Sequence, residues 1–372
     1  MKKPIIEPTD SKKRPSATVR LRSAPASASA SAPAPAPASC PWLLCSCLLL
    51  LLLAFNASAA PWIRQSSGTL GWLHSVFFLD QKSGWAVGSK GALLTTIDGG
   101  MTWQVGRKPT EDSLQDVYFS DERNGWLVCE ANIYELKANA PRTYLLRTND
   151  GGATWDRVNV SAGDPLGDID ARLVRVVFSR GGRGWVFGEA GIVYATRDGQ
   201  SWKRLQLPTR YLLLGGDFID NERGWLVGAG ATILQTSDGG DTWHASRLID
   251  ARGVRFNATS FIDSRLGWAV GTEGRIFRTV NGGRSWEAQH SGVVVDLKDV
   301  KFLNALDGWA VGAEGTVIHT FDGGLHWISE PTGTTHPLER IFFTDREHGW
   351  AVGFGGTIIT YGRGVAIPRL RQ

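Results

Sequence analysis

Residues 84–103, GWAVGSKGALLTTIDGGMTW, contain two phrases that recur along the rest of the chain. The first phrase, Gly-Trp, recurs seven times in register with the repeat, with spacings of 41, 59, 40, 43, 41 and 41 residues between the tryptophans. These tryptophans are Trp85, Trp126, Trp185, Trp225, Trp268, Trp309 and Trp350. A register this regular indicates an internal repeat of seven units.

The second phrase is a turn of the form Asp-Gly-Gly-x-Thr/Ser-Trp, with His326 in place of Thr or Ser in one copy. Its acidic position is occupied by Asp98, Asp150, Asp238 and Asp322, by Asn281 in one copy, and by Asp198 in a form one residue shorter. Asp and Asn side chains accept hydrogen bonds from the backbone of their own turn, and glycine permits positive φ. We therefore expect these six positions to form turns, without a catalytic role.

Each repeat alternates apolar and polar residues in short runs, such as VYF at 117–119, separated by turns rich in Gly and Asp. This pattern predicts four short strands per repeat. Four strands at a period near 41 residues are typical of a propeller blade. The sequence predicts an all-β protein, a seven-bladed β-propeller of four-stranded antiparallel blades, formed by residues 60–368 as one domain.

The last repeat lacks the Asp-Gly-Gly turn, because Arg363 and Pro368 stand where the acid and the turn tryptophan would be. Residues 61–65, PWIRQ, precede the first repeat in the way that Trp103 and Gln104 precede the second. We predict that this N-terminal strand pairs with the last blade and closes the ring. Closure would remove two open sheet edges, which otherwise invite aggregation.

The first 59 residues have a different character. Residues 1–41 are basic and rich in Ala, Pro and Ser, and we expect them to be disordered. Residues 42–59 combine an apolar run at 42–55 with Ala57-Ser58-Ala59, the pattern of a signal peptide. The run is shorter than the roughly 20 residues of a membrane-spanning helix. We expect export to the periplasmic or lumenal side, with an uncleaved membrane tether as the alternative.

The basic excess belongs to this leader. It holds seven of the 40 basic and two of the 36 acidic residues, so the remainder carries a charge of about −1. This balance does not favour a nucleic-acid partner. Three of the four cysteines also lie in the leader, which leaves Cys129 alone and excludes a disulfide framework in the mature chain. The histidines show no metal-ligand spacing, and we expect neither a metal nor a cofactor.

Two insertions interrupt the repeat, at residues 130–142 and 159–171. Strand alternation predicts that both emerge on the same face of the ring. The links between blades on that face carry the partner-binding candidates Arg172, Arg175, Arg210, Arg247, Arg252 and Arg255. Guanidinium groups bind carboxylates well, and we expect these arginines to form one sector. Solvated surface arginines without a partner are the alternative interpretation.

The turn at residues 96–103 matches the Asp-box, or bacterial neuraminidase repeat. Combined with Phe-x-Asp-x-x-x-Gly-Trp-Ala-Val-Gly at residues 78–88 and the 41-residue period, it resembles the photosystem II stability and assembly factors over residues 61–365. The resemblance implies a non-enzymatic seven-bladed propeller on the lumenal or periplasmic side. It also implies that an arginine patch binds a membrane-protein subunit or precursor.

Two other functions compete with this interpretation. A carbohydrate-active, sialidase-like or glycan-binding propeller would need paired carboxylates. Glu189, Glu273 and Glu314 are the candidates, in turns that we expect to face the channel mouth. A structural subunit of an envelope complex is the third possibility. We predict a binding scaffold without enzymatic activity, which acts as a monomer.

Overall fold

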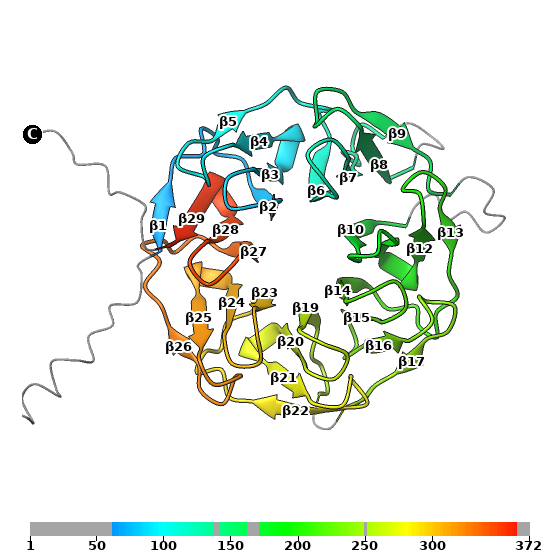
Figure 1. The fold of residues 1–372 in the computed structure, drawn as a ribbon, viewed down its shortest axis with the longest axis vertical. Helices are drawn as coiled ribbons and strands as arrows, with labels where there is room; N and C mark the ends of the chain where they lie inside the picture. The colour runs from blue at the N-terminus through cyan, green and yellow to red at the C-terminus, as the bar shows by residue number, and fades with distance from the viewer. Residues whose placement is uncertain (1–61, 137–140, 162–170, 249–250, 363–372) are drawn as a thin grey trace, which may run out of the picture. The chain divides into compact units, whose positions relative to one another are not determined.

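The computed structural model describes residues 62–136, 141–161, 171–248 and 251–362. Seven sheets are arranged in a ring around a central axis (Figure 1). This arrangement confirms the predicted seven-bladed β-propeller of four-stranded antiparallel blades. The leader at 1–41, the signal region at 42–59 and the chain end from 363 lie outside the described residues. Within the described ranges, no helix is both long and apolar enough to cross a membrane.

Blades one to four each take four consecutive strands, with the first strand innermost and the fourth at the rim. Blade one contains β2 (Leu73–Phe78), β3 (Gly84–Gly88), β4 (Leu93–Thr96) and β5 (Gln104–Val105). Blade two contains β6 (Ser113–Phe119), β7 (Gly125–Glu130), β8 (Thr143–Thr148) and β9 (Asp156–Val158). Blade three contains β10 (Leu173–Phe178), β11 (Gly184–Gly188), β12 (Val193–Thr196) and β13 (Lys203–Arg204). Blade four contains β14 (Leu213–Phe218), β15 (Gly224–Gly228), β16 (Ile233–Thr236) and β17 (His244–Ala245).

Blade five has an additional strand, and the fourth strand of blade seven comes from the N-terminal segment. Blade five contains β19 (Phe256–Phe261), β20 (Gly267–Gly271), β21 (Ile276–Thr279) and β22 (Ser285–Gln289), with β18 (Arg247–Leu248) parallel to β22. Blade six contains β23 (Leu297–Phe302), β24 (Gly308–Gly312), β25 (Val317–Thr320) and β26 (Ile328–Ser329). Blade seven contains β27 (Leu338–Phe343), β28 (Gly349–Gly353) and β29 (Thr357–Tyr361). Its fourth strand is β1 (Ile63–Gln65), antiparallel to β29, with Ile63 opposite Thr360.

The Gly-Trp phrase joins neighbouring blades. A Cβ atom on Gly84 would lie 2.4 Å from the Phe78 ring, so the glycine lets this phenylalanine cover the second strand. Trp350 of blade seven stacks on Phe78 with ring centroids 3.5 Å apart, and its indole N–H donates to the Gly99 carbonyl at 2.8 Å. The repeated tryptophans are therefore buried between blades, where each contributes packing and most can add a directed hydrogen bond.

The turn tryptophans form a second layer. Trp103 meets the Phe78 ring edge-on at 5.9 Å, and five other blades repeat this T-shaped pair. In blade seven, Trp62 meets Phe343 in the same way, at 6.0 Å and 82°. The N-terminal segment thus supplies both the strand and the tryptophan that the last repeat lacks.

The two ends of the blades form different faces. At the end that we call the link face, turns between the second and third strands contact the links between blades; Ser89 N donates to Trp72 O at 2.8 Å. Most of these turns are 3-10 turns: η1 (Ser89–Gly91), η2 (Glu189–Gly191), η3 (Thr272–Gly274), η4 (Ala313–Gly315) and η5 (Phe354–Gly356). At the opposite end, the box face, the Asp-box turns contact the turns between the first and second strands; Gly99 N donates to Lys82 O at 2.9 Å.

The described ends of both insertions lie on the link face, as expected. Thr143, where the first insertion rejoins the sheet, donates from its hydroxyl to the carbonyl of Ala171, the last residue of the second insertion, at 3.1 Å. Residues 137–140 and 162–170 of these insertions are outside the described ranges.

Candidate functional site

The innermost strands surround a cavity of about 450 Å³ near the link-face end of the channel. All seven blades line it, and its lining includes the cationic side chains of Arg172, Arg175, Arg255, Lys298 and Arg340, whereas Glu339 is the sole acid among the lining residues. The lining consists of Trp72, His74, Gln115, Arg172, Val174, Arg175, Leu212, Leu214, Arg255, Asn257, Lys298, Glu339 and Arg340. This arrangement suits an anionic guest.

A local irregularity of the innermost strands explains why so many side chains reach the cavity. In each blade the pairing register shifts near the start of that strand, for example between Leu173 and Arg175 in β10. Such a bulge disrupts strict alternation, so consecutive residues can be aimed toward one side. Val174 and Arg175 both line the cavity, as do Glu339 and Arg340.

A buried ion network lies beneath the mouth. Arg340 Nη2 is 2.6 Å from Asp116 Oδ1, and Arg340 Nε is 4.0 Å from Asp299 Oδ2. Asp116 also accepts hydrogen bonds from Ser75 Oγ at 2.7 Å and from Val176 N at 3.0 Å. Burial opposes the charge of Arg340, but Asp116 and Asp299 outweigh it and hold the pKa of Arg340 above its usual value. This network joins blades one, two, three, six and seven across the channel.

Arg175 has a longer nearest ion-pair contact than the other three cavity arginines. Its nearest ion-pair contact is 3.9 Å, from Nη1 to Asp299 Oδ1, and its side chain is 14% exposed. Burial and then the neighbouring Arg340 charge lower the pKa of Arg175 to about 10. The residue stays protonated at neutral pH, but it is held with little direct hydrogen bonding to a carboxylate. An incoming carboxylate would therefore gain a charge-assisted hydrogen bond here.

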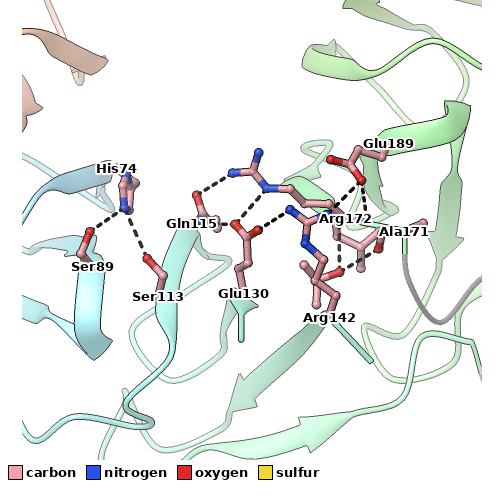
Figure 2. A network of polar contacts seen from close by, with 11 residues as sticks. His74, Ser89, Ser113, Gln115, Glu130, Arg142, Ala171, Arg172 and Glu189 are labelled. Carbon is pink, nitrogen blue, oxygen red and sulfur yellow. Dashed lines mark hydrogen bonds and ion pairs between the residues drawn. The ribbon is translucent and has the colours of Figure 1, made fainter. Parts of the chain in front are cut away.

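Arg172 is positioned by the insertion of blade two (Figure 2). Its Nε donates to Glu130 Oε2 at 2.9 Å, and Nη2 reaches Gln115 Oε1 at 3.5 Å. Glu130 also pairs with Arg142 at 3.1 Å, and Arg142 contacts Glu189 at 3.5 Å. Figure 2 shows the Arg172 guanidinium directed toward Gln115. The insertion thus holds one side of this guanidinium in place at the edge of the cavity.

The opposite side of the mouth carries Arg255 and Lys298. Arg255 donates hydrogen bonds to Asn257 Oδ1 and Asp296 Oδ2, both at 3.2 Å. Its side chain is 43% exposed. Lys298 lies on β23 and has an intermediate exposure. The Arg255 side chain is more exposed than those of Arg175 and Arg340, at 14% and 12%, so it is suited to the first contact with a guest.

An aromatic rim lies beside the cations at the junction of blades one and seven. Trp72 contacts His74 with ring centroids 5.6 Å apart and Phe354 at 5.5 Å. Burial and then the Arg172 charge lower the pKa of His74 to about 4. His74 is therefore neutral at physiological pH, and it shares a hydrogen bond with Ser89 Oγ at 3.0 Å (Figure 2). The mouth combines cations with an apolar edge.

The predicted arginine sector is divided in the structure. Arg172, Arg175 and Arg255 line the cavity, but Arg210, Arg247 and Arg252 are exposed and do not. Arg247 lies on β18, which pairs with β22 at the outer edge of blade five. The cavity therefore gathers only three of the six candidates, because part of the link from blade four, including Arg247 on β18, follows the rim and does not lead directly to the channel.

The acidic candidates are also placed differently from the expectation. None of Glu189, Glu273 and Glu314 lines the central cavity, because the turns that hold them follow the second strands and not the innermost ones. Glu189 instead contacts Arg142 and accepts a hydrogen bond from Arg172 N at 3.3 Å. Cys129 is buried in the core between blades one and two, where burial raises the pKa of its thiol.

Sequence reasoning missed Lys298, Arg340 and the aromatic rim. The arginine candidates lie in or beside the links between blades, whereas the cavity is built mainly from the innermost strands. Aligning the seven strands on the leucine or phenylalanine that begins each run would have placed Arg175 and Arg340 at one equivalent position, with Asp116 and Asp299 there too. Two acids and two bases at one equivalent position of the seven innermost strands would have predicted the buried network.

The family model and the related sequences that match this chain point to the same protein family. The model of the family described as "Photosynthesis system II assembly factor YCF48" matches residues 54–133, 105–211, 200–290 and 287–362. Photosystem II assembly protein Ycf48 of Thermosynechococcus vestitus is 45% identical over 64 residues, covering 17% of this chain and 18% of the relative. Photosystem II assembly lipoprotein Ycf48 of a Synechococcus species is 34% identical over 113 residues, covering 29% and 32%. The aligned stretches thus span less than a third of these relatives.

Solved structures share the fold over most of the chain. YCF48 from Cyanidioschyzon merolae has a TM-score of 0.65 at 21% identity, covering 82% of this chain and 99% of the other. A structure of YCF48 bound to a D1 peptide has a TM-score of 0.66 at 20% identity, covering 84% and 100%. The GH74 xyloglucanase from Xanthomonas campestris has a TM-score of 0.63 at 12% identity, covering 84% and 55%. At these identities the likeness concerns the fold alone.

Proposed function

Because the chain belongs to the family of photosystem II assembly factors described as YCF48, we propose that it is an exported, non-enzymatic assembly scaffold. It binds an acidic segment of a membrane-protein subunit or precursor at the cationic mouth of its channel. The relative solved with a D1 peptide provides a precedent for such a guest. The rigid ring contributes preorganised cations, so that little side-chain freedom is lost on binding.

The observation that carries this proposal is the incomplete pairing of Arg175. Its side chain is largely enclosed at the mouth, with 14% exposed, yet its ion-pair contact with Asp299 is 3.9 Å long. A buried charge without good hydrogen bonds is costly, and a carboxylate guest relieves that cost. Arg172, Arg255 and Lys298 around it add attraction for an acidic segment, while Trp72 offers apolar contact beside the cations.

The same cavity argues against a glycoside hydrolase. Hydrolysis of that kind uses two carboxyl groups about 5 to 10 Å apart that can reach the substrate. Among the described residues that line the cavity, Glu339 is the one carboxylate. Asp116 and Asp299 lie deeper, with side chains only 6% and 8% exposed, and both are committed to Arg340. The shared propeller fold of the xyloglucanase does not supply the missing pair.

Fluorescence anisotropy with a labelled D1 peptide tests the proposal in the full chain. Lys298→Gln and Arg255→Gln, which leave the buried network intact, should each weaken binding about five- to thirtyfold, the equivalent of about 1 to 2 kcal/mol. The matched controls Arg210→Gln and Arg252→Gln remove exposed cations outside the cavity and should change affinity less than about twofold.

A peptide with its carboxylates converted to amides should bind weakly to every variant. Absence of peptide binding by the wild type would refute the proposal. An equal loss in the cavity and control variants would instead indicate nonspecific attraction to positive charge, and would refute the assigned site.

A further inference from the structure

The box face carries a set of exposed apolar side chains. We call them the apolar patch: Ile97 and Met101 in blade one, Val280 in blade five, and Leu306, Phe321 and Leu325 in blade six. Each of them is more than half exposed, and Ile97 reaches 78%. Exposed apolar groups that gather on one part of a surface mark contact with a partner or a membrane.

The turn itself does not require these residues. Ile97 and Phe321 directly precede the box acid, and the corresponding residues in blades two, three and four are Asn149, Arg197 and Ser237. Met101 and Leu325 lie three residues after the acid, where blade four has Asp241. Because the same turn forms with polar residues elsewhere in the ring, the apolar side chains of this sector need another explanation.

Polar contacts link the box-face turns of blades one and six through blade seven. Gln81 of blade one donates to Asp345 of blade seven at 2.9 Å, and Arg346 of blade seven forms an ion pair with Asp307 of blade six. These contacts hold the box-face turns of blades six, seven and one together. The parts of the apolar patch in blades one and six therefore flank blade seven on both sides, with Arg346 between them.

The N-terminal segment joins the ring at this same place. β1 starts at Ile63 opposite Thr360, near the end of β29, so Trp62 lies at the box-face end of blade seven. The apolar run at residues 42–55 precedes Trp62 by seven positions. Seven residues span at most about 25 Å. Whenever the apolar run is inserted in a bilayer, this sector of the box face is within reach of the lipid surface.

We propose that the apolar patch docks on a lipid bilayer. Apolar side chains enter the boundary between headgroups and acyl chains, while nearby cations such as Lys82 and Arg346 remain at headgroup level. The ring then rests on the membrane through blades six, seven and one, and the link face with the cationic mouth is directed away from the lipid. This inference concerns the opposite face from the proposed function and stands independently of it.

Depth-dependent fluorescence quenching tests the docking in the full chain. Cys40, Cys45 and Cys47 are replaced by Ser, and Cys129 is left in place because it is buried. An environment-sensitive fluorophore is attached at Leu325→Cys, at Asp241→Cys, or at Arg210→Cys. Asp241 occupies the same turn position on the polar side of the box face, and Arg210 lies on the link face. The chain is incorporated into phosphatidylcholine vesicles that contain nitroxide-labelled lipid.

We expect nitroxide lipid to quench the label at position 325 at least about twofold more than the labels at 241 and 210. Met101→Asp should reduce the quenching at 325 about two- to fivefold, whereas Ala153→Asp, the equivalent change in blade two, should not. Equal quenching at 325 and 241, or stronger quenching at 210, would overturn the proposal.

Two further outcomes would also overturn it. The label at 325 could be shielded before vesicles are added, independently of protein concentration, and remain unquenched by lipid. This result would show that another part of the chain covers the apolar patch. Shielding that rises with protein concentration would assign it to a second copy. The peptide-binding assay does not report on this face, so failure here and failure of the proposed function are distinguishable.

Discussion

At the scale of single residues, the tryptophans of the Gly-Trp phrase do more than fill space. Trp268 stacks on Phe302 at 3.5 Å and donates to the Gly323 carbonyl of the next blade at 3.0 Å. Trp309 stacks on Phe343 at 4.2 Å, but its indole nitrogen has no hydrogen-bond partner among the described residues. The difference arises because the next blade, the seventh, has no Asp-box to offer a carbonyl.

This pair of residues gives a matched prediction. Trp268→Phe removes a buried hydrogen bond and leaves the Gly323 carbonyl with the longer bond from Gln289 Nε2 at 3.3 Å. Trp309→Phe removes a similar ring that does not make this bond. We expect Trp268→Phe to lower the free energy of unfolding by about 1 kcal/mol more than Trp309→Phe. Chemical denaturation of both variants measures the difference, and equal losses would show that the hydrogen bond between blades contributes nothing.

At the scale of the element, the Asp-box turns of blades one, two and four share the same bonds. Asp238 accepts from Thr242 N at 2.9 Å, from the Thr242 hydroxyl and from the Thr236 hydroxyl at 2.8 Å. Desolvation alone would raise the pKa of Asp238, but these hydrogen bonds outweigh it and lower the pKa to about 2. In blade five Asn281 keeps the backbone bond, accepting from Ser285 N at 3.0 Å, and donates to Ser285 Oγ.

The pKa shift predicts a pH dependence. Because the folded-state pKa of Asp238 is depressed, the stability that its carboxylate contributes is fully present above a pH near 4 and is lost as pH falls toward 2. Asp238→Asn, which introduces the residue that blade five carries at this position, should lower the unfolding temperature at pH 7 and have less effect as the pH approaches 2. A deficit that stays constant from pH 7 to pH 2 would contradict this account.

These elements were predictable from the sequence because their signals are local. Each Asp-box and each Gly-Trp phrase specifies its own turn or contact, so counting them was sufficient to predict seven blades. Trp62 was also recognisable, since it precedes its strand as Trp103 precedes Gln104. The cavity has no such local signal. Arg340 and Asp116 are 224 residues apart in sequence and meet only because the ring closes.

At the scale of the whole molecule, the ring separates two surfaces with different chemistry. The link face has a cationic mouth held by ion pairs between blades, and the box face has the apolar patch beside the point where the N-terminal segment joins. The links between blades did not predict the residues of the mouth, because a link can run along the outer rim of the ring, as β18 does. A scaffold of this form can present a guest on one side while its other side contacts a surface.

The central claim is that the cationic mouth binds carboxylates of the guest, and a charge exchange tests it most directly. Lys298→Glu in the full chain should weaken binding of the acidic D1 peptide at least about tenfold. A peptide with its acidic residues changed to Lys should bind this variant better than it binds the wild type. The circular dichroism and unfolding temperature of the variant serve as the control for folding. If Lys298→Glu weakens both peptides equally, or affects neither, the mouth is not the binding site.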